Sequence, residues 1–398
     1  MSPPGPVHLR QVRTGNLQAL LRAVLDGPAS RADLATRTGL TKATVTSLVE
    51  PLLRQRILTE DPVVNTGRGR PSRPLRFAEE APVAVGAEIN VRHLGVTVQR
   101  LDGTTVAERH IDLDNRHRDA DDLIDRLADL VRTTITESGV ALLGIGLAVP
   151  GIVREGTVVH APNVPGLTDV RIGDRLAAAL GEPAVAVDNE ANLAALAHLW
   201  PHRLAGDDFV YVSGDVGIGA GIVLGGSLFR GRGGFAGELG HVVIERGGRH
   251  CACGGQGCVE QYAGLRAILA AAGAPGLDAL CRALRRGDTH SRAAVNCAGS
   301  ALGTALASLI NVCDVATVVL GGCYASLFDD LAPGVRAELG IGVLAAARRP
   351  VTLTVSPLGR AAVARGAAAL ITRRSCLEPE LLLAPGPSAT GDRRSTTV

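Results

Sequence analysis

The first fifty residues alternate between apolar positions at helical spacing and short polar breaks. The first predicted helix has its apolar positions at Leu17, Leu20, Leu21, Val24 and Leu25. Gly27-Pro28 ends it, because glycine can close a helix and proline cannot continue one. Ser30 and Asp33 form a capping-box pattern that opens a second helix through Arg37, and Gly39 gives the turn before Thr41 caps a third. The pattern therefore predicts three consecutive helices.

The third predicted helix has two faces of different character. Its apolar face, expected in the core, comprises Val45, Leu48, Val49, Leu52 and Leu53. Its small, polar or cationic residues lie near the N-terminal end and comprise Lys42, Ala43, Thr44, Thr46 and Ser47. Pro51 lacks the N–H of an intrahelical bond, so we expect it to kink or interrupt the helix beyond this polar end.

Two short strand-like segments, 57–60 and 75–77, follow the helices, and the loop Asn65–Pro74 joins them as a wing would. A helix-turn-helix places the N-terminal residues of its second helix against base edges, which makes Lys42, Thr44, Thr46 and Ser47 the candidates for DNA contact. Arg68, Arg70 and Arg73 of the loop can reach phosphates or a narrow minor groove.

Charge supports this interpretation. Through Phe77 the chain carries 12 Lys and Arg against 5 Asp and Glu, a charge of +7 within a total of +2. We therefore expect an N-terminal tail over 1–13 and a winged helix-turn-helix over 14–78 that binds operator DNA. A three-helix packing module with a solvated basic face is the alternative.

From Pro82 the pattern of apolar and polar residues changes from helical spacing to strand-like segments. Three of them, 83–89, 93–101 and 105–113, precede a helix over 119–138 and a buried strand over 143–149. A second such run starts at Phe209. This order predicts an α/β body over 82–373, with two actin-like (ribonuclease-H-like) lobes around a cleft. The end of the chain, 374–398, is rich in Pro, Ser, Thr and Arg and is predicted to be a disordered tail.

The N-terminus has no apolar segment typical of export, and no stretch reaches the roughly 18 uncharged apolar residues of a membrane span. We therefore expect a cytoplasmic protein that is not embedded in a membrane. Eight cysteines could indicate disulfides, but the close spacing of Cys251, Cys253 and Cys258 suits a metal in a reducing compartment.

These cysteines and His241 offer three thiolates and one imidazole within eighteen residues, the ligand set of tetrahedral structural Zn²⁺. The alternative is a group of buried, unligated cysteines. The other cysteines are scattered and are expected to have no role.

The segments Gly237-Glu-Leu-Gly-His241 and Cys251-Ala-Cys-Gly-Gly-Gln-Gly-Cys-Val-Glu260 resemble the signature of the ROK family of sugar kinases and repressors. Val187–Asn192, Pro162–Gly166, Gly217–Gly221 and Val319–Gly322 occur in the family's order, so the resemblance spans roughly 83–369, and the winged helix matches its repressor branch. The resemblance implies sugar contacts at Asn163, Asn189, Glu190, Glu238, His241 and Glu260. Ordinary surface glutamates are the alternative for Glu238 and Glu260.

Three departures from the family's kinases indicate that the body does not phosphorylate. Glu88-Ile-Asn-Val-Arg92 stands where the kinases have the phosphate loop Asp-x-Gly-Gly-Thr, and Asp215-Val-Gly217 replaces Gly-Thr-Gly. Glu190 stands in place of the catalytic aspartate, and a displacement of about 1 Å can cost a hundredfold in rate.

The sequence therefore predicts a repressor that is not an enzyme, with a sugar or sugar-phosphate effector. We expect a homodimer or dimer of dimers that reads a pseudo-palindromic operator. Two alternatives remain, an active ATP-dependent sugar kinase with its own DNA-binding domain, and a constitutive DNA-binding protein whose body is only a scaffold.

Overall fold

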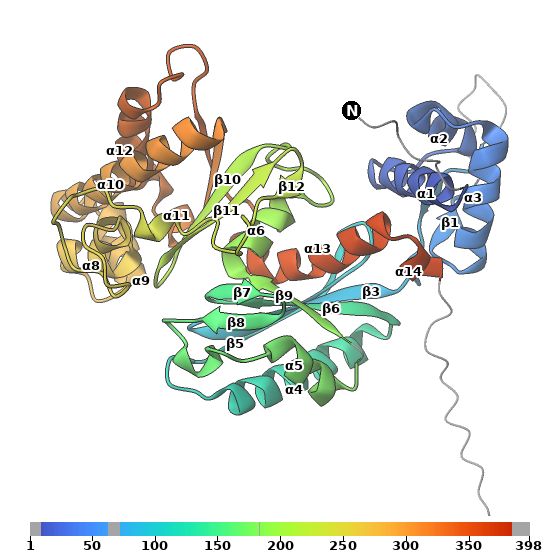
Figure 1. Ribbon diagram of the computed structural model, residues 1–398, viewed down its shortest axis with the longest axis horizontal. Coiled ribbons are helices and arrows are strands. Elements are labelled where there is room, and N and C mark those ends of the chain that lie inside the picture. The colour runs from blue at the N-terminus through green and yellow to red at the C-terminus, as the bar shows by residue number, and fades with distance from the viewer. Residues whose placement is uncertain (1–8, 63–71, 183, 384–398) are drawn as a thin grey trace, which may run out of the picture. The chain divides into compact units, whose positions relative to one another are not determined.

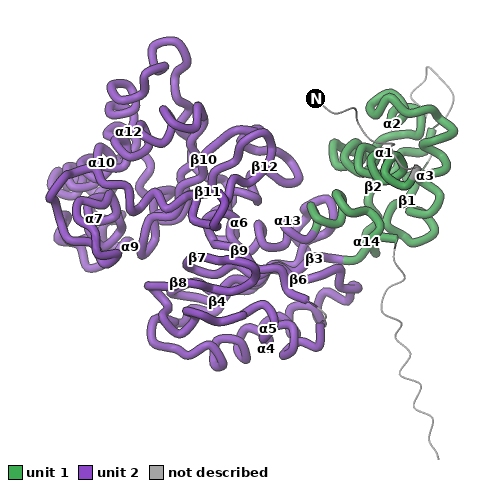
Figure 2. The backbone as a smooth tube through the Cα atoms, in the orientation of Figure 1, with its two compact units in different colours: residues 1–82, 372–398 green, residues 83–371 purple. Residues whose placement is uncertain are grey.

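The computed structural model describes residues 9–62, 72–182 and 184–383. It divides the chain into two compact units, with boundaries after Pro82 and after Ile371 (Figure 2). The smaller unit takes the N-terminal elements together with the last described turns of the chain, and the larger unit takes everything between.

The smaller unit consists of three helices and a two-stranded antiparallel sheet (Figure 1). These elements are α1 (Leu9–Leu25), α2 (Arg31–Thr38), α3 (Lys42–Arg54), β1 (Leu58–Glu60) and β2 (Leu75–Phe77). The Ser30 hydroxyl accepts a bond from the backbone of Asp33, whose carboxylate accepts one from the backbone of Ser30. Gly39 ends α2 with a φ of 72°, and Thr41 caps α3. The predicted helices and their caps are confirmed.

Pro51 does not interrupt α3, which continues to Arg54. The predicted tails also need correction. Helix α1 begins at Leu9, within the expected tail over 1–13, and α13 (Ala362–Leu377) and α14 (Glu380–Leu383) extend beyond residue 374. The segment is ordered because Cys376 and Leu382 are 3% and 4% exposed. Residues 384–398 lie outside the described part of the chain.

Three side-chain bonds hold this last segment to the N-terminal helices of the same unit. The Gln18 amide donates to the carbonyl of Leu377 (2.5 Å), and the Gln55 amide donates to that of Leu383 (2.8 Å). The Thr14 hydroxyl donates to Glu380 at 2.5 Å. The winged-helix unit is therefore completed by residues from the far end of the chain.

The first lobe of the larger unit is a five-stranded sheet with the order β5-β4-β3-β6-β9. Its strands are β3 (Val83–Ile89), β4 (His93–Gln99), β5 (Thr105–Asp112), β6 (Leu142–Val149) and β9 (Val185–Asn189), and a hairpin of β7 (Ile152–Arg154) and β8 (Thr157–His160) follows β6. Helices α4 (Ala120–Ser138) and α5 (Ile172–Leu180) lie on one face and α13 on the other (Figure 1). Every residue of β3 and β4 is buried because both faces are covered.

The second lobe repeats this topology with the order β12-β11-β10-β13-β14. Its strands are β10 (Phe209–Gly214), β11 (Ile218–Leu224), β12 (Ser227–Leu228), β13 (Thr317–Gly322) and β14 (Thr352–Val355). Its helices are α7 (Glu260–Ala263), α8 (Leu265–Ala272), α9 (Leu277–Arg285), α10 (Thr289–Cys313), α11 (Cys323–Ser326) and α12 (Phe328–Gly342), and α6 (Glu190–Leu199) contacts both β9 and β11. In each sheet the first three strands are antiparallel and the last two run parallel to the first, which confirms the predicted two-lobed α/β body.

The longest described helix, α10, has a composition that resembles a membrane span. Within the described ranges, α10 is long and apolar enough by length and composition to cross a membrane, and the bent pair α8 and α9 would pass the same test together. Half of that stretch of α10 is buried, and its Leu302, Leu306 and Ile310 belong to the core of the second lobe. The small and apolar residues of α10 are explained by its close packing against α12. A side chain at Gly299 would meet the carbonyl oxygen of Leu331 in α12 at 2.3 Å.

Candidate functional site

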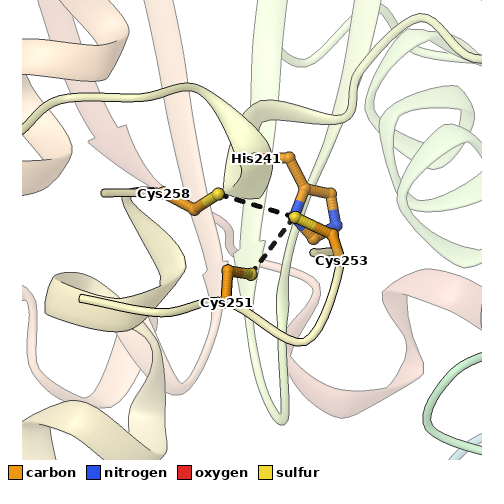
Figure 3. A group of neighbouring side chains, drawn as sticks. All are labelled: His241, Cys251, Cys253 and Cys258. Carbon is orange, nitrogen blue, oxygen red and sulfur yellow. Dashed lines mark hydrogen bonds between the residues drawn. The ribbon is translucent and has the colours of Figure 1, made fainter. Parts of the chain in front are cut away.

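The loop between η2 (Leu239–His241) and α7 gathers the four predicted metal ligands (Figure 3). One ligand atom from each of His241, Cys251, Cys253 and Cys258 lies within 4.8 Å of all the others. The sulfurs of Cys253 and Cys258 are 3.7 Å apart, and the Cys251 sulfur is 3.8 Å from Nδ1 of His241. These distances and the donor set fit one tetrahedrally coordinated ion such as Zn²⁺.

The loop reaches this shape through backbone conformations that favour glycine. Gly254 and Gly257 have φ angles of 90° and 79°. A side chain at Gly257 would also meet the carbonyl oxygen of Glu245 at 1.7 Å, so no other residue fits there. Cys251 and Cys258 are 7% and 1% exposed, whereas Cys253 is exposed and His241 is half-buried, so the metal group has one buried side and one side that faces solvent.

His241 joins the metal group to the predicted sugar contacts. Its Nδ1 faces Cys251, while its Nε2 lies 3.9 Å from the carboxylate of Glu238. Burial raises the pKa of Glu238, Glu260 adds repulsion, and His241 and His160 oppose the shift. Glu238 thus lies close to both of these histidines and to Glu260.

Glu260, two residues after the last cysteine, starts α7. Its carboxylate accepts a bond from the backbone N–H of Ile218 at 3.1 Å. A side chain built at Gly217 would meet this carboxylate at 2.6 Å and the Asn163 amide at 3.6 Å, so both groups lie beside the same turn. The structure therefore brings together Asn163, Glu238, His241 and Glu260. Their carboxylates, amide and imidazole are groups that can form hydrogen bonds with hydroxyls.

The side chain of Asn189 forms most of its hydrogen bonds with backbone groups. Its side-chain oxygen caps α6 by accepting from Ala191 and Asn192, and its amide donates to the carbonyl of Gly151 at 2.8 Å. One amide hydrogen remains for a ligand. The predicted sugar contact at Asn189 is thus reduced to a single donor, and the residue's main role in the structure is the helix cap.

Glu190, the first residue of α6, lies in a buried group of acids. Burial raises its pKa to about 8, with further repulsion from Asp215 and Glu88. Burial and Glu88 raise the pKa of Asp215 to about 6. The amide of Asn90 is 3.5 Å from the Glu190 carboxylate. The sequence identified Glu88 and Asp215 only as departures from phosphate loops, and Glu190 as a sugar contact in place of a catalytic aspartate. It gave no sign that the three acids lie close together.

The raised pKa of Glu190 predicts a dependence of stability on pH. A carboxyl group with a higher pKa in the folded chain binds its proton more tightly there, so its contribution to stability is complete below the unfolded value near 4.5 and is lost as the pH rises through about 8. We expect Glu190→Gln to remove part of this loss, on the order of a few kcal/mol. The free energy of unfolding in urea, measured from pH 5 to 8.5, should fall less steeply for Glu190→Gln than for the wild type.

Loss of a metal at low pH would affect the wild type and Glu190→Gln alike. The quantity to compare is therefore the difference between the two proteins in the slope of unfolding free energy against pH. Asp329→Asn, which changes an exposed acid at the start of α12, should keep the wild-type slope. Equal slopes for all three proteins would contradict the buried acid group.

An ion pair that the sequence did not predict fixes the end of β9, next to Glu190. Arg230, in the loop after β12, donates to Asp188 at the end of β9 through two nitrogens, at 2.6 and 2.8 Å. Asp188 also accepts from the amide of Asn192. A contact between residues 42 positions apart leaves no local signal in the sequence.

In the smaller unit, Lys42, Thr46 and Ser47 are exposed on α3 and Thr44 is half-buried. The Thr44 hydroxyl lies 2.9 Å from that of Thr41, and the Thr46 hydroxyl donates to the carbonyl of Lys42. Arg73 pairs with Glu60 of β1 at 3.7 Å. Arg68 and Arg70 lie outside the described residues. The exposed end of α3 is thus available for contact, with the two threonine hydroxyls already bonded within the helix.

Comparisons with known proteins agree with this geometry. The ROK family model matches residues 84–374. The chain is 29% identical to the xylose repressor of Bacillus subtilis (strain 168) over 374 residues, which cover 90% of this chain and 95% of the repressor. It is 26% identical over 350 residues to the DNA-binding transcriptional repressor Mlc of Escherichia coli (strain K12), covering 82% and 86% of the two chains.

Two solved structures extend the comparison. A ROK family transcriptional regulator described as a homolog of the Escherichia coli Mlc protein superposes with a TM-score of 0.78 at 27% identity, over 94% of this chain and 98% of the other. A ROK family glucokinase from Streptomyces griseus, in complex with glucose and AMPPNP, superposes with a TM-score of 0.62 at 25% identity, over 72% of this chain and 98% of the kinase chain. The kinase covers a smaller share of this chain than the regulator does.

Proposed function

The chain belongs to the ROK family, and on that premise we propose that it is a sugar-responsive transcriptional repressor. The observation that carries this proposal is the presence in one chain of a winged helix-turn-helix and the group of Asn163, Glu238, His241 and Glu260. The repressor relatives match both parts, since the Bacillus subtilis protein is similar over 90% of this chain. We propose that sugar hydroxyls bind in this group and that the exposed end of α3 binds operator DNA.

We further propose that a structural Zn²⁺ is held by His241, Cys251, Cys253 and Cys258. Four protein ligands fill a tetrahedral site, so the ion would brace the loop and leave no position for a reacting water. The four ligands lie between Glu238 and Glu260 in the chain, so the shape of this segment affects the distance between the two carboxylates.

We propose that the body does not phosphorylate its sugar. Burial raises the pKa of Glu190 and of Asp215, and the charge of Glu88 adds to both shifts, so negative charge is disfavoured at this place. A nucleotide in this part of the cleft would bring phosphates against these acids. ATP turnover with a panel of hexoses would instead support the rival interpretation as a kinase.

Binding of the sugar can change the affinity for DNA only if the sugar prefers one arrangement of the two lobes. We propose that the metal loop transmits this preference to the DNA-binding unit. The repressor would act in the cytoplasm as a homodimer or dimer of dimers on a pseudo-palindromic operator.

We expect Glu238→Ala to retain operator binding and to lose induction by sugar, because it removes a hydroxyl acceptor from the body and leaves the winged helix unchanged. Thermal unfolding against xylose, glucose and N-acetylmannosamine first finds the effector, and fluorescence anisotropy then measures release of an operator selected from random DNA.

Asp329→Ala removes an exposed carboxylate from the same body and should respond as the wild type does. A Glu238→Ala protein that still releases DNA on sugar addition would exclude this role for Glu238. Absence of any shift in melting temperature with every sugar would favour a body that is only a scaffold.

A further inference from the structure

Helices α10 and α12 lie side by side in the second lobe, and the face that they turn away from its core carries little charge (Figure 1). Over 296–313 the chain has no charged residue, although Thr304, Ser308 and Val312 of α10 are exposed at helical spacing. A helix face that contacts water normally carries charged residues. The composition that makes α10 resemble a membrane span therefore belongs to its outward stripe as well as to its buried one.

Three large aliphatic side chains are exposed where these two helices end. Val312 of α10 is 84% exposed, Ile341 of α12 is 83% exposed, and Leu344, just after α12, is 95% exposed. The side-chain amide of Asn311 holds the two helix ends together, because it donates to the carbonyl of Gly342 at 2.8 Å and accepts from the N–H of Leu344 at 3.0 Å. The segment that presents Leu344 is thus fixed by hydrogen bonds to α10.

A hollow of about 150 Å³ lies beside this projecting leucine, and Leu344 forms part of its wall. The rest of its apolar wall comes from Ile310, Val315, Val343 and Val351. An apolar space of about 150 Å³ can hold a group the size of benzene, so the side chain of a leucine fits it. One face of the lobe therefore carries both a projecting apolar side chain and a place that could receive one.

A second copy of this chain is the partner that fits such a face. A two-fold axis brings the projecting leucine of each copy to the hollow of the other, so the face is complementary to itself. The charges at the edge of the hollow agree, because both signs are present. Asp314 pairs with Arg349, and the neighbouring Arg348 has no ion pair within the described ranges. Two copies related by a two-fold axis can match acid to arginine across the contact, which a strongly acidic or basic partner could not.

We propose that the outward face of α10 and α12, with Val312, Ile341 and Leu344 at its centre, is an interface between two copies of this chain. The small exposed side chains of Ser308 and Ala337 would let the helices of the two copies approach closely. The choice of a second copy rests in part on the proposed function, which calls for a homodimer or dimer of dimers. The face contains none of the proposed metal, sugar or DNA contacts, so it can be tested apart from them.

The test is sedimentation equilibrium of the full, zinc-loaded chain over a range of protein concentrations. We expect the wild type to associate, and Leu344→Asp and, separately, Ile341→Asp to halve its molar mass. The dissociation constant should rise by at least about a hundredfold, because a two-fold interface contains each substituted residue twice. Leu204→Asp makes the same exchange at an exposed leucine between α6 and β10, and it should associate as the wild type does.

Both substituted positions are exposed, so each variant should keep its zinc and the melting temperature of the diluted wild type. A monomeric wild type, or two variants that associate as tightly as the wild type, would overturn the proposal. Cosedimentation of the wild type with vesicles of phosphatidylcholine and phosphatidylglycerol, lost in Leu344→Asp, would assign the face to a membrane instead. A melting shift with sugar in a chain that stays monomeric would overturn the interface and leave the proposed function standing.

Discussion

Cys258→Ser is expected to weaken metal binding by roughly a hundredfold and to abolish the sugar response. A structural zinc site contributes about 10–16 kcal/mol in small metal-dependent domains, so loss of one of four ligands should cost roughly 3 kcal/mol. Cys258 is 1% exposed and lies two residues before Glu260, so a loosened loop would displace that carboxylate. Zinc content after dialysis against a graded chelator, followed by thermal unfolding with the effector sugar, measures both effects.

Cys297→Ser is the matched control, because it makes the same exchange at an exposed cysteine of α10 outside the metal group. It should keep one zinc per chain and the full sugar shift. Operator binding without sugar should be retained in both variants, since the metal loop belongs to the larger unit. A Cys258→Ser protein as resistant to chelation as the wild type would mean that this thiol is not a ligand.

The features that sequence predicted well depend on neighbouring residues. The capping box of Ser30 and Asp33 and the left-handed Gly39 are decided within a few positions, and the structure has them as expected. The metal group is likewise confined to one loop, and its spacing limits the chain to a tight turn. Local chemistry of this kind can be read from a single sequence.

The features that sequence missed depend on distant partners. The segment after residue 374 was predicted to be disordered from its composition, yet Gln18 donates to Leu377, 359 positions away. Glu88 was interpreted as the loss of a phosphate loop, but it is 1% exposed because it lies in β3 against Gly95 and His93 of β4. Asn189 was predicted to be a sugar contact, and only the three-dimensional position of Gly151 shows how its amide is used.

The second large effect concerns DNA. Ser47→Glu is expected to lower operator affinity by at least about a hundredfold, because it places a negative charge on the exposed end of α3, which we propose faces phosphates and base edges. The side chain is exposed, so the melting temperature should change little. The measurement is fluorescence anisotropy with the selected operator over a series of salt concentrations.

Thr136→Glu adds the same charge to an exposed position of α4 in the larger unit and should leave operator affinity within about twofold of the wild type. The deficit of Ser47→Glu should shrink as salt rises, because repulsion from phosphates is screened and the wild type loses its own counterion-release advantage. Equal affinity of the two variants at low salt would place the DNA on another face of the winged helix. A loss of operator affinity that did not change with salt concentration would instead indicate a steric effect at the α3 surface.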